Sequence, residues 1–100
     1  VTEFVEENLH QDLSLAELAQ VAELSPFHFA RSFKQATGMT PIQFLTQRRV
    51  EQAKQLLLKA ELPIVEIGFR VGFKNQSHFT TLFRRLTTMT PKSYRLAAQR

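Results

Sequence analysis

The sequence contains no cysteine among its 100 residues, and only 3 glycines and 4 prolines. Without cysteine, the chain has no disulfide framework, no thiolate zinc site and no cysteine nucleophile. The lack of cysteine also fits a reducing cytosol, so we expect a cytoplasmic protein. The scarcity of glycine and proline counts against a turn-rich sandwich or barrel and favours helices.

Long hydrophobic runs are also missing. The longest aliphatic run is Leu56-Leu57-Leu58, whereas a membrane span needs ~20 apolar residues. No basic and then apolar leader opens the chain, so we expect no secretory signal and no membrane partner. The first residue is Val1 rather than Met, which indicates a piece of a longer protein. Its length and its 43% of hydrophobic residues predict one folded domain over 1–100.

Charge is distributed unevenly. The net charge of +4 combines a first half with four cations and six anions and a second half with nine cations and three anions. A basic patch of this kind is typical of proteins that bind nucleic acid or an anionic surface. A basic surface that is merely solvated is the alternative.

Helix-capping signals predict seven helices and no strand. Ser14 with Glu17 forms a capping-box pattern, and proline follows an N-cap residue at Pro26, Pro41 and Pro91. Gly38 supplies a left-handed stop. The predicted helices cover about 2–9, 15–22, 26–37, 41–59, 63–70, 76–87 and 91–98.

The sequence also repeats itself. At an offset of 50, seven residues recur within 28–41, and they are His28, Phe29, Phe33, Thr37, Met39, Thr40 and Pro41. Further upstream the offset is 49, so the second copy has one extra residue in its turn. The repeated unit is a short helix, a tight turn and a second helix, which is the form of a helix-turn-helix. We therefore expect lobe one over about 2–40, a linker helix over about 41–59 and lobe two over about 62–98. A chance likeness between two helix pairs is the alternative.

Apolar spacing separates a core face from an outward face in the second helix of each copy. The core stripes are predicted as Phe29, Phe33 and Ala36 in one helix and Phe79, Leu82, Phe83 and Leu86 in the other. The outward residues match in position but differ in chemistry. Two recognition helices for different DNA sequences would show this pattern.

The outward residues suit a DNA major groove. Arg31 can donate two hydrogen bonds to guanine, and Gln76 can pair with adenine. The predicted base contacts are Phe27, Ala30, Arg31, Gln76, Ser77, Thr80 and Thr81. The predicted phosphate contacts, which position the protein on the duplex, are Lys34, Lys74, Arg84 and Arg85. A linker helix of 19 residues would be ~28 Å long, close to the ~34 Å between successive major grooves.

Several of these residues have ordinary structural alternatives. Arg31 could be a solvated cation, and Phe27 could pack against the preceding helix. His28 and His78 are interpreted as structural, since they have no metal-ligand spacing. For two further arginines, Arg48 and Arg49, ion pairing with Glu51 or Glu61 competes with DNA contact.

The combined pattern resembles the AraC/XylS family of bacterial transcription regulators, in its two-lobed DNA-binding domain. The resemblance covers about residues 2–96 and is strongest in the segments Ile67–Phe73, Asn75–Phe79, Phe83–Arg85 and Thr90–Arg95, with Ser25–Phe29 and Thr40-Pro41 in the first copy. It implies an all-α fold of seven helices, with two helix-turn-helix lobes joined by a long linker helix.

The resemblance also implies a function and partners. Recognition helices 26–37 and 76–87 would lie in adjacent major grooves of double-stranded DNA, with base contacts at the seven positions given above. It implies a parent protein with an effector-binding or dimerisation domain, and contact with RNA polymerase. Thr88 departs from the family pattern, which often has glycine there, so we expect this turn to take another form. At the base-contact positions, Ala30 offers no hydrogen bond and Thr81 replaces the arginine of the first lobe.

Two other classes of function compete with DNA binding. A helical protein-interaction module could use the basic face for an acidic partner. An enzyme is disfavoured, because the sequence has no cysteine, no glycine-rich phosphate loop and no carboxylate–histidine grouping on one predicted face. The methyl-accepting cysteine of the family's DNA-repair relatives has no match here. We therefore predict no catalytic residue, no metal and no cofactor.

Overall fold

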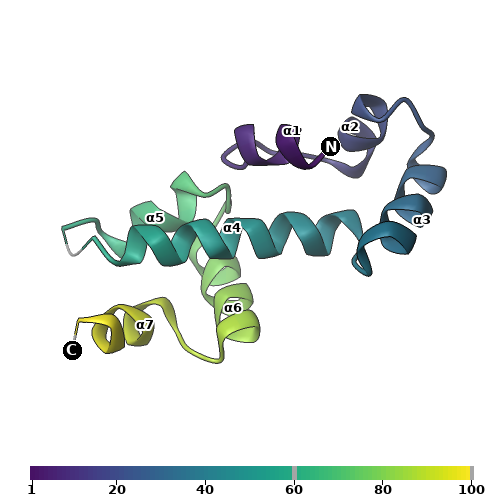
Figure 1. The fold of residues 1–100 in the computed structure, drawn as a ribbon. Coiled ribbons are helices and arrows are strands. Elements are labelled where there is room, and N and C mark those ends of the chain that lie inside the picture. Colours follow the sequence, from purple (N-terminus) through teal and green to yellow (C-terminus); the bar gives the residue numbers. More distant parts are fainter. Residues whose placement is uncertain (60, 100) are drawn as a thin grey trace.

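The computed structural model describes residues 1–59 and 61–99, and these residues form seven helices and no strand. The all-α architecture of two helix-turn-helix lobes on a long linker helix is thereby confirmed (Figure 1). None of the described helices is long and apolar enough to cross a membrane. The helices are α1 (Thr2–Glu7), α2 (Leu15–Val21), α3 (Pro26–Thr37), α4 (Pro41–Leu57), α5 (Ile64–Arg70), α6 (Gln76–Thr87) and α7 (Pro91–Ala98).

The predicted N-caps determine where most helices begin. Ser25 Oγ accepts a hydrogen bond from the backbone N–H of His28 at 3.2 Å, and Asn75 Oδ1 accepts from that of His78 at 2.7 Å. As a result α3 and α6 have the bounds that the sequence predicts. The capping box at Ser14 is only half made, because the carboxylate of Glu17 accepts from the Ser14 hydroxyl instead of the Ser14 backbone N–H.

Four predicted bounds differ from the structure. Helix α2 ends at Val21 instead of residue 22. Helix α1 ends at Glu7 instead of residue 9, and α5 begins after Pro63, which is its N-cap. Helix α4 ends at Leu57, two residues before the predicted end. There the guanidinium of Arg95 donates to the carbonyl oxygens of Leu57 at 3.0 Å and Lys59 at 3.1 Å. These carbonyls are satisfied by a side chain of α7, so the helix need not continue.

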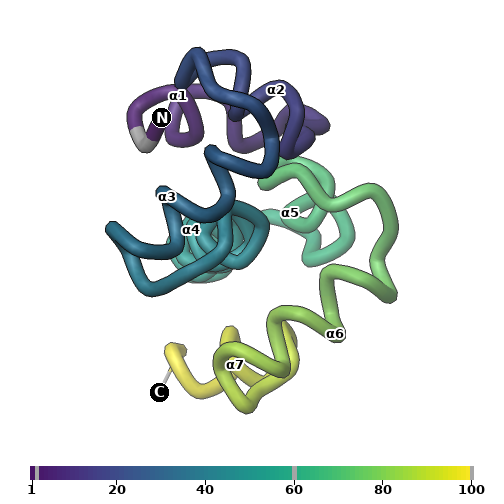
Figure 2. Tube along the Cα trace, turned by 90° about the vertical axis from the view of Figure 1, so that its right-hand side faces the viewer, coloured from purple at the N-terminus to yellow at the C-terminus, as the bar shows by residue number. Residues whose placement is uncertain are grey.

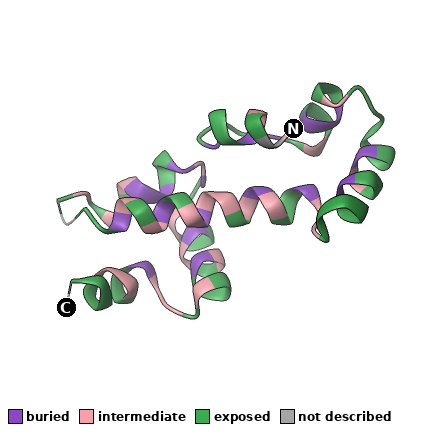
Figure 3. Cartoon of the chain, viewed as in Figure 1, coloured by how far each residue is buried: buried purple, intermediate pink, exposed green. Residues whose placement is uncertain are grey.

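Two hydrophobic cores lie along α4, one in each lobe (Figure 3). Lobe one consists of α1–α3 and the start of α4, and lobe two of α5–α7 and the rest of α4. The first core contains Val5, Leu9, Leu13, Leu18, Ala19, Phe29, Phe33 and Leu45. The second contains Val50, Ala53, Leu57, Ile67, Val71, Phe73, Phe79 and Phe83. The molecule is elongated, with principal extents of 45 × 22 × 22 Å.

The core stripes of the two recognition helices are shorter than predicted. Both phenylalanines of each stripe are buried, but Ala36 is exposed, Leu82 is partly exposed and Leu86 is 48% exposed. The prediction for Ala36 and Leu86 is wrong, because only the first two turns of each helix pack into a core. The last turn of each helix faces solvent.

Hydrogen bonds in the two turns show the repeat in atomic detail. The Leu24 N–H donates to the Ala19 carbonyl at 3.0 Å, and the Phe73 N–H donates to the Gly68 carbonyl at 3.0 Å. These pairs are related by the offset of 49 found in the sequence. The two helix-turn-helix units therefore share the hydrogen bond that closes the turn after their first helix.

The C-terminal ends of α3 and α6 are equivalent as well. Gly38 has φ +79° and Thr88 has φ +66°, and both are left-handed C-caps. Each donates its N–H to the carbonyl four residues earlier, at 2.8 Å. The expectation that Thr88 changes the form of this turn is therefore wrong. The hydroxyl of Thr87 bonds to two carbonyls across the turn, as that of Thr37 does in the first lobe, and this holds the backbone in place.

Candidate nucleic-acid interface

The outer face of α3 brings together the predicted contact residues of lobe one. Phe27 is 70% exposed, and Arg31 and Lys34 are exposed beside the partly buried Ala30. Gln35 and Thr40, which were not predicted as DNA contacts, line the same open hollow as these four residues. The alternative that Phe27 packs against the preceding helix is wrong. Among the described residues, no acidic side chain pairs with Arg31 or Lys34.

The outer face of α6 is polar and carries smaller side chains. Ser77 and Thr81 are exposed, and Thr80 is partly buried. Arg84 and Arg85 lie exposed in the last turn, where cations also interact favourably with the helix dipole. Hydroxyl groups on this face can bond to either kind of base or to phosphate.

Gln76 differs from the expected geometry. Its Oε1 is buried and accepts no hydrogen bond from the described residues. A Cβ atom on Gly68 would lie 2.8 Å from the Phe79 ring and 3.3 Å from this oxygen, so the glycine of α5 leaves room for both. The predicted adenine pair needs both the oxygen and the nitrogen of the amide. In this conformation Gln76 exposes at most one of them, so the two-bond contact would require the side chain to rotate.

Lys74 is already bound to an acidic partner. Its Nζ lies 2.8 Å from Asp12 Oδ2 in the loop between α1 and α2. The hydrogen bond and charge of Lys74 hold the pKa of the Asp12 carboxyl below its ordinary value. A phosphate that binds Lys74 would therefore share its ammonium group with this carboxylate.

The two arginines of the linker helix are held by lobe one. Arg48 pairs with Glu6 instead of the predicted Glu51 or Glu61. Arg49 donates to the carbonyl oxygens of Leu9 at 2.9 Å and Gln11 at 2.5 Å. Burial lowers the pKa of Arg49. Both side chains join α4 to the first lobe.

The histidines at the third position of each recognition helix, His28 and His78, are exposed. His28 Nδ1 lies 2.8 Å from Ser25 Oγ, so it belongs to the cap of α3. The ring of His78 stands edge-on to Phe73, with centroids 5.8 Å apart. The described part of the chain contains no grouping of three potential metal ligands among histidine, cysteine, aspartate and glutamate.

Comparison with known proteins places this geometry in a family. Residues 18–97 match the family model described as a helix-turn-helix domain. The DNA-binding domain of AdpA, solved in complex with a target DNA, superposes with a TM-score of 0.93 at 33% identity, covering 98% of this chain and 88% of that one. An AraC-type regulator from Chromobacterium violaceum superposes with a TM-score of 0.88 at 30% identity, covering 97% and 87%. This chain belongs to the AraC/XylS family of transcription regulators.

Curated members of the AraC/XylS family are longer than this chain. The bifunctional transcriptional activator/DNA repair enzyme AdaA of Bacillus subtilis is 36% identical over 95 residues, which is 95% of this chain and 45% of AdaA. The chain thus spans less than half the length of this relative. Its extent matches the DNA-binding domain of AdpA, which it covers almost completely.

Proposed function

We propose that this chain is the DNA-binding part of an AraC/XylS-type regulator, with α3 and α6 as recognition helices in adjacent major grooves of one duplex. The main support is that two copies of one helix-turn-helix unit expose chemically different faces on their second helices. A recognition helix needs such an uncovered face to approach base edges. Different outer residues on equal backbones then specify different half-sites.

The dimensions of the molecule are compatible with two recognition helices on one duplex. Helix α4 has 17 residues, which makes it about 26 Å long at ~1.5 Å per residue. By itself it is shorter than the ~34 Å groove repeat, but the whole molecule extends 45 Å. Helix α3 lies at the N-terminal end of α4 and α6 lies beside its middle, and both run in roughly the same direction in the two views (Figures 1 and 2).

Each lobe would contact DNA through its own residues. Arg31 would donate two hydrogen bonds to guanine, with Phe27 and Ala30 against thymine methyl groups. In lobe two, Ser77, Thr80 and Thr81 would meet base edges, and Gln76 would offer one end of its amide. The phosphate contacts would be made by Lys34, Lys74, Arg84 and Arg85. Lys74 would bond phosphate through one of its three N–H donors while another stays on Asp12.

The rest of the parent protein follows from the family. We expect the chain to be joined to an effector-binding or dimerisation domain, to contact RNA polymerase, and to act on nucleoid DNA in the cytoplasm. The support is that the chain covers 45% of AdaA and lacks the remainder of that protein. We assign this chain one domain and no catalytic role, since a methyl-accepting cysteine has no counterpart in it.

Fluorescence anisotropy with random and genomic duplexes tests this function. We expect binding that weakens as salt rises, because phosphate contacts release counterions. Arg84→Ala should weaken binding to all sequences alike and reduce the salt slope by about one. Arg70→Ala is the matched control, because Glu66 already neutralises Arg70 at 2.7 Å. No binding at low salt would contradict the proposal and favour a protein-interaction module with a basic face.

A further inference from the structure

The two lobes touch each other directly beside the middle of α4. The loop after α1 lies against the turn between α5 and α6, and Arg49 of α4 donates to two carbonyls of that loop. The ion pair between Asp12 and Lys74, at 2.8 Å, closes the same junction. We call this junction the interlobe clamp, and its residues are Leu9, Gln11, Asp12, Arg49, Gly72 and Lys74.

Gly72 shows how closely the lobes approach. Its φ of +106° favours glycine by itself, whereas Glu23 at the equivalent position of lobe one has φ +59°, in the left-handed region that other residues also adopt. A Cβ atom on Gly72 would lie 2.2 Å from the Leu9 carbonyl oxygen and 2.6 Å from Arg49 Nε. The close approach of lobe one therefore requires glycine here.

Lys74 is the residue by which the second turn is longer than the first. The offset of the repeat changes from 49 at Phe73 to 50 at Asn75, so Lys74 has no counterpart in lobe one. It reaches across to Asp12 in the other lobe. The one insertion that breaks the repeat thus contributes a contact between the lobes.

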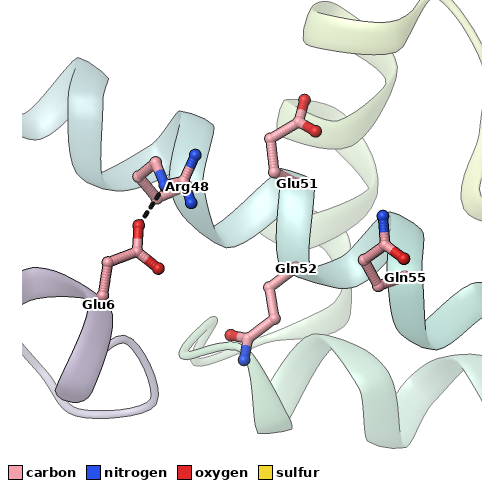
Figure 4. Close-up of a pocket in the computed structure, with 5 residues that line it drawn as sticks. All are labelled: Glu6, Arg48, Glu51, Gln52 and Gln55. Carbon is pink, nitrogen blue, oxygen red and sulfur yellow. Dashed lines mark hydrogen bonds and ion pairs between the residues drawn. The ribbon is translucent and has the colours of Figure 1, made fainter.

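Helix α4 alone attaches lobe one weakly. Of its buried apolar side chains, only Leu45 belongs to the first core, with the partly buried Phe44 beside it, whereas Val50, Ala53 and Leu57 belong to the second. The first core therefore contacts one end of α4, and the bonds of Arg49 to Leu9 and Gln11 hold lobe one at a second place, near the middle of the helix. Arg48 adds an ion pair to Glu6 of α1, and the side chains around this pair come from α1 and α4 (Figure 4).

We propose that the interlobe clamp fixes the separation and angle of α3 and α6, so that it determines the spacing of the two half-sites on DNA. The inference rests on the proposed function. A rigid connection raises the effective concentration of the second recognition helix only when the two half-sites match its span. Arg49 is then a positioning residue, which acts on specificity without touching a base.

Arg49→Met tests the clamp, because it keeps the bulk of the side chain and removes its bonds to Leu9 and Gln11. The measurements are dissociation constants for a full site, for duplexes with either half scrambled, and for a full site with one base pair inserted. We expect Arg49→Met to leave the affinities for the half-scrambled duplexes unchanged. It should lower the ratio of full-site to half-site affinity about tenfold, and the inserted base pair should then weaken binding less than it does in the unaltered protein. Arg48→Met, which breaks only the pair with Glu6, should behave as the unaltered protein does.

Two further substitutions keep the test decisive if Arg49→Met fails to fold. Gly72→Ala should lower the ratio of full-site to half-site affinity more than Gly38→Ala does, because a Cβ atom at Gly38 would meet nothing within 4 Å. Asp12→Ala changes an exposed residue and should also lower the ratio of full-site to half-site affinity. If Asp12→Ala tightened binding to all duplexes alike and left the ratio of full-site to half-site affinity unchanged, the clamp would be contradicted. A folded Arg49→Met variant that keeps the spacing preference would also contradict it. If the unaltered protein binds no duplex, the proposed function itself fails.

Discussion

The two lobes use one backbone plan but pack it to different degrees. In lobe two, Ile67, Phe79 and Phe83 are 0% exposed, whereas in lobe one Phe29 is 3% and Phe33 is 9% exposed. The difference arises because lobe two surrounds the later half of α4, while lobe one packs only against its beginning. Repeating a fold unit therefore does not repeat its stability, which depends on what the linker helix adds to each core.

The outward faces differ as much as the cores. Lobe one presents a large exposed ring, Phe27, and a long cation, Arg31, whereas lobe two presents short hydroxyl side chains. Thr81 occupies the position in lobe two that Arg31 occupies in lobe one. The shared backbone fixes where a recognition helix lies, and the outward side chains fix what it contacts.

The largest effect should come from the second core. Phe83→Ala should lower the free energy of unfolding by about 5 kcal/mol and Phe33→Ala by about 3 kcal/mol, the two ends of the usual range for this truncation. The reason is that Phe83 is fully buried between Phe79 and Tyr94, whereas Phe33 keeps some contact with water. Urea unfolding of both variants measures this. An equal or larger loss for Phe33→Ala would contradict the difference between the lobes.

The next effect concerns base preference. Arg31→Ala should relax discrimination at one base pair by about 1–3 kcal/mol, because it removes a two-bond contact. Thr81→Ala at the equivalent position should cost less, about 1 kcal/mol, since one hydroxyl bond is lost. Competition binding with single-base variants of a target measures both. Arg31→Lys is the control, since it keeps the charge but not the planar pair of donors. If Arg31→Lys still discriminated between the single-base variants, Arg31 would act through its charge alone.

A smaller effect should come from the two C-caps. Thr88→Gly should stabilise the protein by about 1 kcal/mol, because it relieves a β-branched residue at positive φ. Gly38→Thr should destabilise it by a similar amount, about 1 kcal/mol, since space is free at Gly38 and only the backbone conformation is strained. Thermal unfolding of both variants gives the answer. Destabilisation by Thr88→Gly would show that the threonine side chain supports this turn.

The smallest effect should come from the ion pair between the lobes. Because Lys74 lowers the pKa of folded Asp12, the pair stabilises the fold above the pKa of the unfolded group and loses this contribution as pH falls through the folded pKa. The difference in urea midpoint between the unaltered protein and Asp12→Asn should thus be constant near neutral pH and shrink below pH 3.8, the ordinary pKa of this carboxyl. A difference that does not depend on pH would mean that charge is not involved.

The sequence predicted the features that depend on neighbouring residues. The bounds of α3, α6 and α7 follow from an N-cap residue and a short apolar stripe, and such signals act within one helical turn. The end of α4 could not be predicted in this way, because Arg95 binds there from another helix.

The contacts that distant residues make at the site could not be predicted in this way. The amide oxygen of Gln76 is buried beside Gly68 of another helix, and the partner of Lys74 lies in lobe one. The repeat placed Gln76 on its helix but gave neither of these contacts. Gly72 carried a signal that could have been found, since lobe one has glutamate at the equivalent position.

In vitro selection of bound duplexes from a random pool tests the central claim most directly. Two recognition helices on one duplex predict two enriched patches about 10 base pairs apart. Arg31→Ala should blur one of these patches and leave the other unchanged. A single patch, or two patches that both change with Arg31, would contradict the account.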